Sequence, residues 1–232
     1  MNEGRIPWKR VIAEAVAIVV SILFAFGIQA WWETRGERER ERIALEALAE
    51  DFAAADSILQ VRALAIDSAA DAAREIIDLV GPTADLSGSD RIAILLPRVI
   101  RRPTFEPPMG TLQALLGSGE LRLIRNPELK AELASFPSAL QSMATTQDYG
   151  TQVVFSMLLP YVNARVPMLE FGLLATGESD FPVDRAALVR SLEFENLVQN
   201  RWMGIGFEQR EAEAVGGRIS IIRQLLREQS SR

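Results

Sequence analysis

The fold is decided by the stretch ALEALAEDFAAADSILQVRALAIDSAADAAREIIDLV, residues 44–80. Apolar residues recur in it every seven positions, and a companion row follows three positions after the first. The two rows are Leu45, Phe52, Leu59, Ile66, Ala73 and Val80, and Leu48, Ala55, Ala69 and Ile76, with Arg62 as the exception. A repeat of this period places both rows on one face of a helix. It predicts a helix from about Glu33 to Val80, ended by Gly81-Pro82 and roughly 70 Å long if straight.

Toward the N-terminus the same helix is expected to continue into a membrane. Residues 11–32 carry one acid, Glu14, at their start, and the run from residue 15 to residue 28 is uncharged and apolar except for Ser21. Trp8 and Trp31 lie 23 residues apart, which corresponds to roughly 35 Å along a helix. We therefore predict a short tail over residues 1–10, a transmembrane helix over residues 11–32, and a helical bundle domain over residues 33–232. Trp8, Trp31 and Trp32 would lie at the membrane interfaces.

A cleaved signal peptide and a buried core helix are the alternatives to this anchor. No small-x-small cleavage site precedes the polar region. A core helix is rarely bracketed by tryptophans and a dense charge run. The uncleaved anchor is therefore favoured over both.

A run of alternating glutamate and arginine follows the predicted span. Opposite charges fall three residues apart, pairing Glu37 with Arg40, Arg38 with Glu41, and Glu39 with Arg42. Such pairs contribute only tenths of a kcal/mol, so the run predicts a solvated helical stalk. Basic residues flank both ends of the span almost equally. We favour an N-terminus inside, because Lys9 and Arg10 then need not cross the membrane, which places the bulk of the chain in the periplasm.

Small residues recur every fourth position within the predicted span, at Ala13, Ala17, Ser21 and Ala25. Small residues let two membrane helices approach closely. The row favours a packing face for a homodimer or for a partner membrane protein. The frequency of alanine in this chain is an equally good explanation, and the sequence leaves both open.

Helical patterns account for the rest of the chain. A short helix is expected near residues 90–101 and another near residues 111–116, separated by the proline-rich stretch RRPTFEPPMG, residues 101–110. Asn126-Pro127 predicts the start of a helix that runs to about residue 163, disturbed near Pro137 and Pro160. A loop over residues 165–183 precedes helix from about residue 184 to residue 229, broken near Ser191. Its expected inward positions are Leu197, Ile205, Val215, Ile219, Ile222 and Leu226.

The predicted fold class is therefore all-α. One N-terminal transmembrane helix continues into a long helical stalk, and an elongated helical bundle follows.

Composition excludes most kinds of catalytic site. The chain has no cysteine and no histidine, and its two lysines leave little material for a serine–lysine dyad. The net charge of −6 comes from mixed acids and bases without a basic stripe, so nucleic acid is an unexpected partner. Gly117 and Gly119 predict a structural turn and not a phosphate loop, and Gly204 and Gly206 predict close helix packing. No cofactor, metal site or enzymatic activity is expected.

Two further groups of residues could in principle contribute to a site. Acid/base chemistry would have to use paired carboxylates among Asp148, Glu170, Glu178 and Asp180, although solvated surface acids are the commoner case. Aromatic side chains could line a ligand pocket between helices, although core packing is the commoner role; the candidates are Phe105, Tyr149, Phe155, Tyr161 and Phe171.

Several motifs resemble those of a family of bacterial single-pass membrane proteins of unknown function. The exit FGIQAWWE, residues 26–33, is similar to an IALQINNWNE-like exit in that family, with Trp-Trp in place of Asn-Trp. The stretch ALLGSGELRLIRNPELK, residues 114–130, is similar to an ELISSGNLDLIKNxELR-like motif. Weaker matches are LLPYVN, residues 158–163, and EFENLVQNR, residues 193–201. The resemblance implies the same architecture in the bacterial cytoplasmic (inner) membrane, and it transfers no catalytic residues.

The function expected from the sequence is that of a membrane-anchored, non-enzymatic helical module. It would act through protein–protein contacts in the cell envelope, as a scaffold, assembly factor or accessory subunit. Its expected partners are the lipid bilayer and either a second copy or another membrane protein. The alternative is a periplasmic ligand-sensing domain that signals through its membrane helix, with an unknown ligand.

Overall fold

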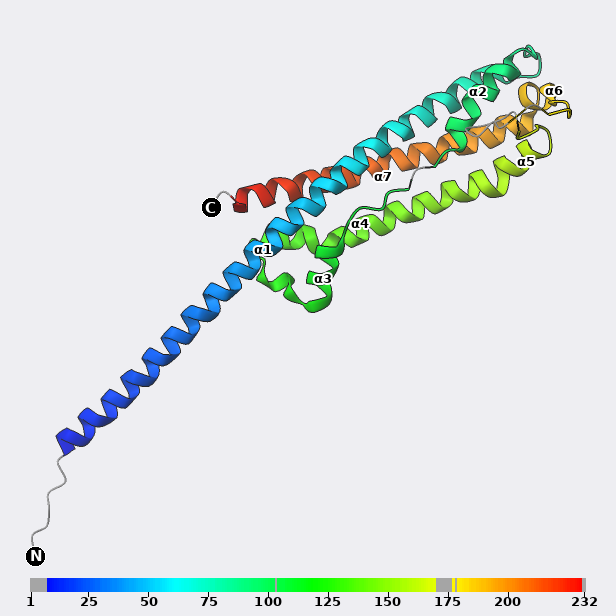
Figure 1. Cartoon of the computed structure of the whole chain (residues 1–232). Coiled ribbons are helices and arrows are strands. Elements are labelled where there is room, and N and C mark those ends of the chain that lie inside the picture. The colour runs from blue at the N-terminus through cyan, green and yellow to red at the C-terminus, as the bar shows by residue number, and fades with distance from the viewer. Residues whose placement is uncertain (1–7, 103, 170–176, 178, 231–232) are drawn as a thin grey trace, which may run out of the picture.

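The computed structural model describes residues 8–102, 104–169, 177 and 179–230, and within them the side chains of residues 8–13, 15–18 and 230 are not described. The described chain is all-helical and contains no strand (Figure 1). The elements are α1 (Trp8–Leu79), α2 (Gly88–Ile100), α3 (Gly110–Ser118), the 3₁₀ helix η1 (Glu120–Leu123), α4 (Pro127–Gln152), the π-helix η2 (Val153–Leu158), α5 (Leu159–Asn163), α6 (Arg185–Val189) and α7 (Leu192–Ser230). The all-α prediction is confirmed.

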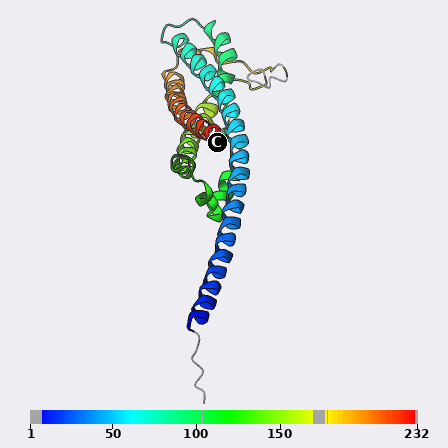
Figure 2. The same cartoon turned by 90° about the vertical axis from the view of Figure 1, so that its left-hand side faces the viewer.

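Helix α1 is one uninterrupted element of 72 residues. At a rise of about 1.5 Å per residue it is roughly 110 Å long. Its first part projects alone from the molecule, and its second part belongs to the bundle (Figures 1 and 2). The predicted continuity of the stalk with the preceding segment is confirmed, and so is the end of the helix just before Gly81.

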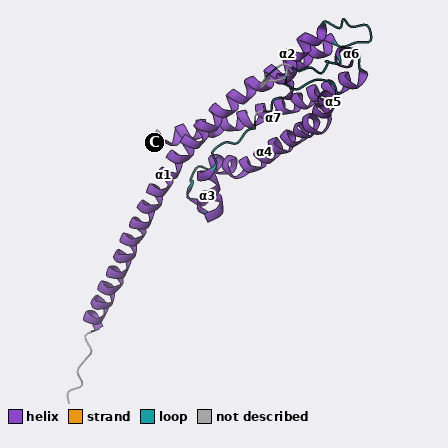
Figure 3. Ribbon diagram, turned by 45° about the vertical axis from the view of Figure 1, so that its right-hand side comes forward, coloured by secondary structure: helices purple, strands orange, loops and turns teal. Residues whose placement is uncertain are grey.

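Three long helices form the bundle. Helix α7 packs against both α1 and α4 and runs antiparallel to them, while α2 covers the far end of α1 (Figure 1). Residues 104–109 return along the bundle without helical structure. They lead to α3, which lies where the projecting part of α1 joins the bundle (Figure 3). Prolines at positions 107 and 108 remove backbone donors from this connection, which keeps it out of a helix.

The heptad rows form the core face of α1. The fully buried members are Leu48, Phe52, Ala55, Ala73 and Ile76, and Leu59, Ile66 and Ala69 are nearly so. Leu45 and Val80, at the two ends of the stripe, are half-buried. All six inward positions expected on α7 are buried as well. Phe52 packs edge to face against Phe136 of α4, with ring centroids 5.0 Å apart. The apolar stripe of α1 is therefore buried by helices of the same chain.

Local sequence signals fix most helix ends. Asn126 caps α4, since its side chain accepts hydrogen bonds from the backbone N–H groups of Glu128 and Leu129. Gly119 ends α3 in the left-handed region at φ 73°, a conformation that glycine adopts at little cost. Ser191 separates α6 from α7 and accepts a hydrogen bond from the N–H of Phe194. The predicted cap at Asn126 and the predicted break near Ser191 are confirmed, whereas α3 continues through Gly117 to Ser118, beyond the expected end near residue 116.

The long helix after Asn126 differs from expectation at its prolines. Helix α4 passes through Pro137 without interruption. The predicted disturbance at Pro160 takes the form of η2, in which the N–H of Leu159 bonds to the carbonyl of Val154. Proline has no N–H and its ring crowds the preceding turn, so the helix widens before it.

The stalk is not solvated all round. Glu39 and Arg42 form the predicted pair, with Arg42 Nη2 2.6 Å from Glu39 Oε1. Glu41, in contrast, is only 5% exposed and accepts hydrogen bonds from the N and Nε of Arg125 at 2.8 and 2.6 Å. The predicted solvated pair of Glu41 with Arg38 is therefore wrong, because the turn after η1 docks on the stalk at this point.

The predicted membrane segment is only partly described. Within the described part of the chain, no helix combines the length and the apolar character that crossing a membrane requires. Residues 1–7, which include most of the predicted N-terminal tail, and the side chains of residues 11–13 and 15–18 of the predicted span lie outside that part.

Candidate functional site

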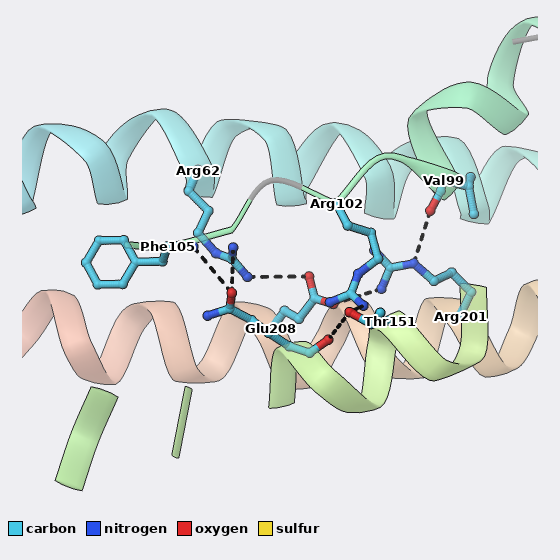
Figure 4. A network of polar contacts seen from close by, with 8 residues as sticks. Arg62, Val99, Arg102, Phe105, Thr151, Arg201 and Glu208 are labelled. Carbon is cyan, nitrogen blue, oxygen red and sulfur yellow. Dashed lines mark hydrogen bonds and ion pairs between the residues drawn. The ribbon is translucent and has the colours of Figure 1, made fainter. Parts of the chain in front are cut away.

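A buried cluster of charged side chains joins the three long helices near the middle of the bundle (Figure 4). Arg62 comes from α1, Arg102 from the segment that follows α2, and Arg201 and Glu208 from α7. Their side chains are only 2%, 8%, 1% and 3% exposed, respectively. Charged side chains are almost never buried this deeply unless they are paired.

Glu208 is the hub of this arginine–glutamate cluster. Its Oε1 accepts hydrogen bonds from Arg201 Nη1 at 3.0 Å and from Arg102 Nη2 at 3.1 Å. Its Oε2 lies 3.9 Å from Arg62 Nη2. One carboxylate therefore connects side chains from three separate parts of the chain.

Neutral groups add further hydrogen bonds to the cluster. Arg201 Nε donates to the carbonyl of Val99 in α2 at 3.0 Å. On α4, Thr151 Oγ1 accepts from Arg102, and Gln147 Oε1 accepts from Arg62 at 3.4 Å. Gln147 Oε1 also accepts from the N–H of Phe105 at 3.3 Å, which ties the returning segment to α4.

The cluster has more positive than negative charge. Three guanidinium groups surround one buried carboxylate, so its formal charge is +2. Burial of the guanidinium lowers the pKa of Arg102 to about 10; Glu208 opposes the shift, whereas Arg201 and Arg62 add to it. Burial lowers the pKa of Arg62 and of Arg201 as well, against the attraction of Glu208. The cluster is thus an electropositive centre inside an acidic protein.

Glycine makes this close approach possible. A Cβ built on Gly150 of α4 would lie 2.5 Å from Glu208 Oε1 and 3.0 Å from Arg102 Cζ. A side chain at position 150 would therefore be too close to both groups. The backbone of α4 therefore approaches the ion pair as closely as it does only because residue 150 is glycine.

A surface groove adjoins the cluster. It has a volume of about 510 Å³ and lies between α4 and the returning segment, with Gln113 of α3 at one side. Arg102, Gln147 and Thr151 belong to both the groove and the cluster, while Phe105, Pro137, Leu140 and Ala144 supply apolar wall. The volume is within the range of small-molecule pockets.

The residues predicted at the membrane do not meet this site. Trp31 and Trp32 are exposed on the projecting part of α1, with ring centroids 5.6 Å apart. Ser21 and Ala25 are exposed on the same part of the helix, while the side chains of Trp8, Ala13 and Ala17 lie outside the described part. The assignments of these residues to a membrane interface and a packing face stay predictions.

The aromatic and acidic candidates are scattered. Phe105 lines the groove, and Tyr161 is buried with its hydroxyl donating to the carbonyl of Ala187. Tyr149 and Phe155 are exposed, and Phe171, Glu170 and Glu178 lie outside the described residues. Asp148 is exposed at the groove, and Asp180 is exposed elsewhere. Among the side chains that the structure describes, no group of acids could hold a metal ion.

The cluster was not predicted from the sequence, although a signal for it exists. Arg62 is the one charged residue in the heptad stripe of α1. Arg201 and Glu208 occupy the buried stripe of α7, between Leu197 and Ile205 and between Ile205 and Ala212. Charged residues on two core faces indicate that the faces meet at an ion pair. Arg102, in an irregular segment, gives no such signal.

No family model, no curated protein and no solved structure matches the chain.

Proposed function

We propose that the protein is a membrane-anchored, non-enzymatic helical module that acts through protein–protein contacts in the cell envelope. The anchor is the N-terminal part of α1, and the contact surface is the end of the bundle farthest from it. The module would work as a scaffold, assembly factor or accessory subunit in the bacterial inner membrane, with most of the chain in the periplasm.

The anchor is supported by the apolar run of residues 15–28 and by the surface of the projecting helix. Large apolar side chains between positions 19 and 32 are all exposed there, including Phe24 at 72% and Phe26 at 64%. Apolar surface of this extent on an isolated helix is stabilised when lipid covers it. The Glu/Arg run then begins directly after Trp32, where a spanning helix would enter water.

The contact surface carries the proposal. The end of the bundle farthest from the projecting part of α1 holds α5, α6 and the start of α7 (Figure 1). Phe181 is 79% exposed and Leu192 71%, and Phe155, Met157, Met168 and Leu169 are also exposed. Exposed apolar residues gathered at one end of a molecule are typical of an interaction surface. A rigid stem would hold this surface at a fixed distance from the bilayer.

The membrane topology is tested with a reporter after the C-terminus. An alkaline phosphatase fusion should be active while an N-terminal tag is retained on the chain. A fluorescent green-protein fusion without phosphatase activity would reverse the orientation, and loss of the tag would mean that the segment is cleaved.

The contact surface is tested by site-specific photo-crosslinking in native membranes. A photoreactive residue at Leu192 or Phe181 should give a defined crosslinked species. A photoreactive residue at Glu213, exposed on the middle of α7, serves as the control and should give none. Serine at both positions 181 and 192 should abolish co-purification of the same partner. Equal crosslinking from all three positions would refute a distal contact surface.

A ligand sensor is the second candidate function. It is favoured by the groove beside Arg102, because Glu208 links Arg102 to Arg62 on the helix that leads toward the anchor. A thermal-shift screen of the purified protein against metabolite mixtures separates the two functions. Stabilisation by several degrees with one compound would favour sensing.

A further inference from the structure

The groove beside the arginine–glutamate cluster is lined by two residues of opposite charge and by an apolar wall. Arg102 lies where the groove meets the cluster, and Asp148 of α4 lies exposed at the groove's surface. The apolar wall is built from Pro137, Leu140 and Ala144, which precede Asp148 on the same helix. A ligand that matches this groove needs two charges close together and an apolar body.

Arg102 has capacity to bind an anion. A guanidinium group carries five N–H donors, and Arg102 forms hydrogen bonds to Thr151 and Glu208. Its Nε is buried without a hydrogen-bond partner among the described residues. A buried donor without a partner is costly, and a carboxylate is the acceptor that arginine binds most effectively. The surplus positive charge of the cluster favours the same ligand.

Asp148 supplies the opposite charge. Asp148 and Arg102 line the same groove, and the charge of Asp148 opposes the lowering of the Arg102 pKa by burial. Arg102 nevertheless directs its hydrogen bonds to Thr151 and Glu208, which leaves the carboxylate of Asp148 facing solvent beside the groove. An exposed carboxylate in this position is suited to an ammonium group on the ligand.

We infer that this groove binds a free α-amino acid with an apolar side chain. The α-carboxylate of the ligand is bound by Arg102, its α-ammonium group by Asp148, and its side chain lies along Leu140 and Ala144. An α-amino acid carries both charges on groups attached to one carbon atom, which a simple carboxylic acid or a simple amine does not. The site is independent of the distal contact surface, and it gives the second candidate function a ligand class.

The inference is tested by calorimetric titration of the full-length chain in detergent with three matched probes. L-leucine carries both charges, 4-methylpentanoate lacks the ammonium group, and 3-methylbutylamine lacks the carboxylate. We expect leucine to bind at least about tenfold more tightly than either analogue, because each analogue leaves one charged group of the site without its partner. The three probes share nearly the same apolar body, so they differ mainly in the charged groups that they offer to the site.

Three variants locate the site. Asp148→Asn, at an exposed position, should weaken the binding of leucine about tenfold and leave the binding of 4-methylpentanoate unchanged. Ala144→Phe should fill the groove and abolish binding of leucine without touching the ion pairs. Arg102→Gln should abolish binding of both carboxylates, and circular dichroism checks that it still folds. Asp71→Asn, exposed on α1 away from the groove, is the control and should bind leucine as the parent does.

Three results would overturn the inference. One is the absence of binding for leucine, valine and phenylalanine alike at millimolar concentration. Another is leucine binding that Ala144→Phe and Asp148→Asn leave unchanged, which would place the ligand elsewhere on the protein. Binding of 4-methylpentanoate as tight as that of leucine would reject the amino-acid class in favour of a simple organic acid. None of these results bears on the crosslinking test of the distal surface.

Discussion

Gly150 lies against Glu208 so closely that a Cβ at position 150 would stand 2.5 Å from Glu208 Oε1. The contact joins α4 to α7 at the level where α1 contributes Arg62. Backbone of one helix therefore closes one side of the ion-pair cluster, and the cluster cannot shift without moving that helix.

Gly150→Ala is expected to destabilise the protein by about 1–3 kcal/mol, because the added methyl group must displace a buried carboxylate or the helix itself. Gly206→Ala is the matched control. Its Cβ would meet nothing within 4 Å, so replacing glycine by alanine inside α7 should stabilise by up to about 1 kcal/mol. Denaturant unfolding followed by circular dichroism measures both. Equal effects of the two substitutions would mean that the close contact is not maintained in solution.

Glu208→Gln should be among the most destabilising conservative substitutions in the chain, with a cost of about 3–5 kcal/mol. It leaves three buried guanidinium groups without their shared carboxylate. Glu213→Gln, on the exposed face of the same helix, should change the free energy of unfolding by less than about 0.5 kcal/mol. A Glu208→Gln variant as stable as Glu213→Gln would show that the cluster is solvated.

Arg62→Leu is expected to be far milder than Glu208→Gln, within about 1 kcal/mol of the parent in either direction. It removes one of the surplus positive charges and restores an apolar residue to the heptad stripe, and apolar replacements of buried ions are often neutral. Glu208 keeps its hydrogen bonds from Arg201 and Arg102. Unfolding curves recorded in parallel test the ranking, and a cost equal to that of Glu208→Gln would mean that Arg62 is indispensable for the ion pairs.

Phe52→Asp should cost about 4 kcal/mol or more, since it places an unpaired charge at a fully buried position beside Phe136. Leu59→Asp should also be strongly destabilising, and Leu45→Asp less so, because Leu45 is half-buried. Arg40→Ala, on the exposed stalk, should leave the unfolding midpoint nearly unchanged. If Phe52→Asp and Arg40→Ala unfolded at one denaturant concentration, the assignment of the core face would be wrong.

Self-association within the membrane is tested with residues 1–42 in a bacterial two-hybrid assay. Ala17→Leu and Ser21→Leu should lower the signal, because bulky groups keep two helices apart. Val19→Leu, on another side of the helix, should not. Equal signals from all three variants, or no signal from the parent, would leave the row of small residues without a role.

The fold was largely predictable because its signals are local or periodic. The stripe from Leu45 to Ile76 repeats often enough to define a buried face, and Asn126 and Ser191 mark helix starts by side-chain chemistry that acts within three residues. The form of the helix disturbance at Pro160 was not predictable. Proline removes one hydrogen bond, and tertiary packing selects between a break, a kink and a widened turn.

The candidate site was not predictable to the same degree. Arg62 and Glu208 are 146 residues apart, and periodicity places each on a core face without saying which residue it meets. Arg102 lies in a segment without any period, and Glu41 looks like every other acid in the Glu/Arg run. Both residues are paired with partners that are distant in the sequence. Arg102 pairs with Glu208, and Glu41 pairs with Arg125.

Helix α1 is continuous from the ion-pair cluster to the projecting part of the chain. Arg62 and Trp31 are 31 residues apart, or roughly 46 Å along the axis, and no hinge between them can absorb a rotation. A displacement at the level of Arg62 can therefore pass to Trp31 along one continuous helix, without a joint between two elements.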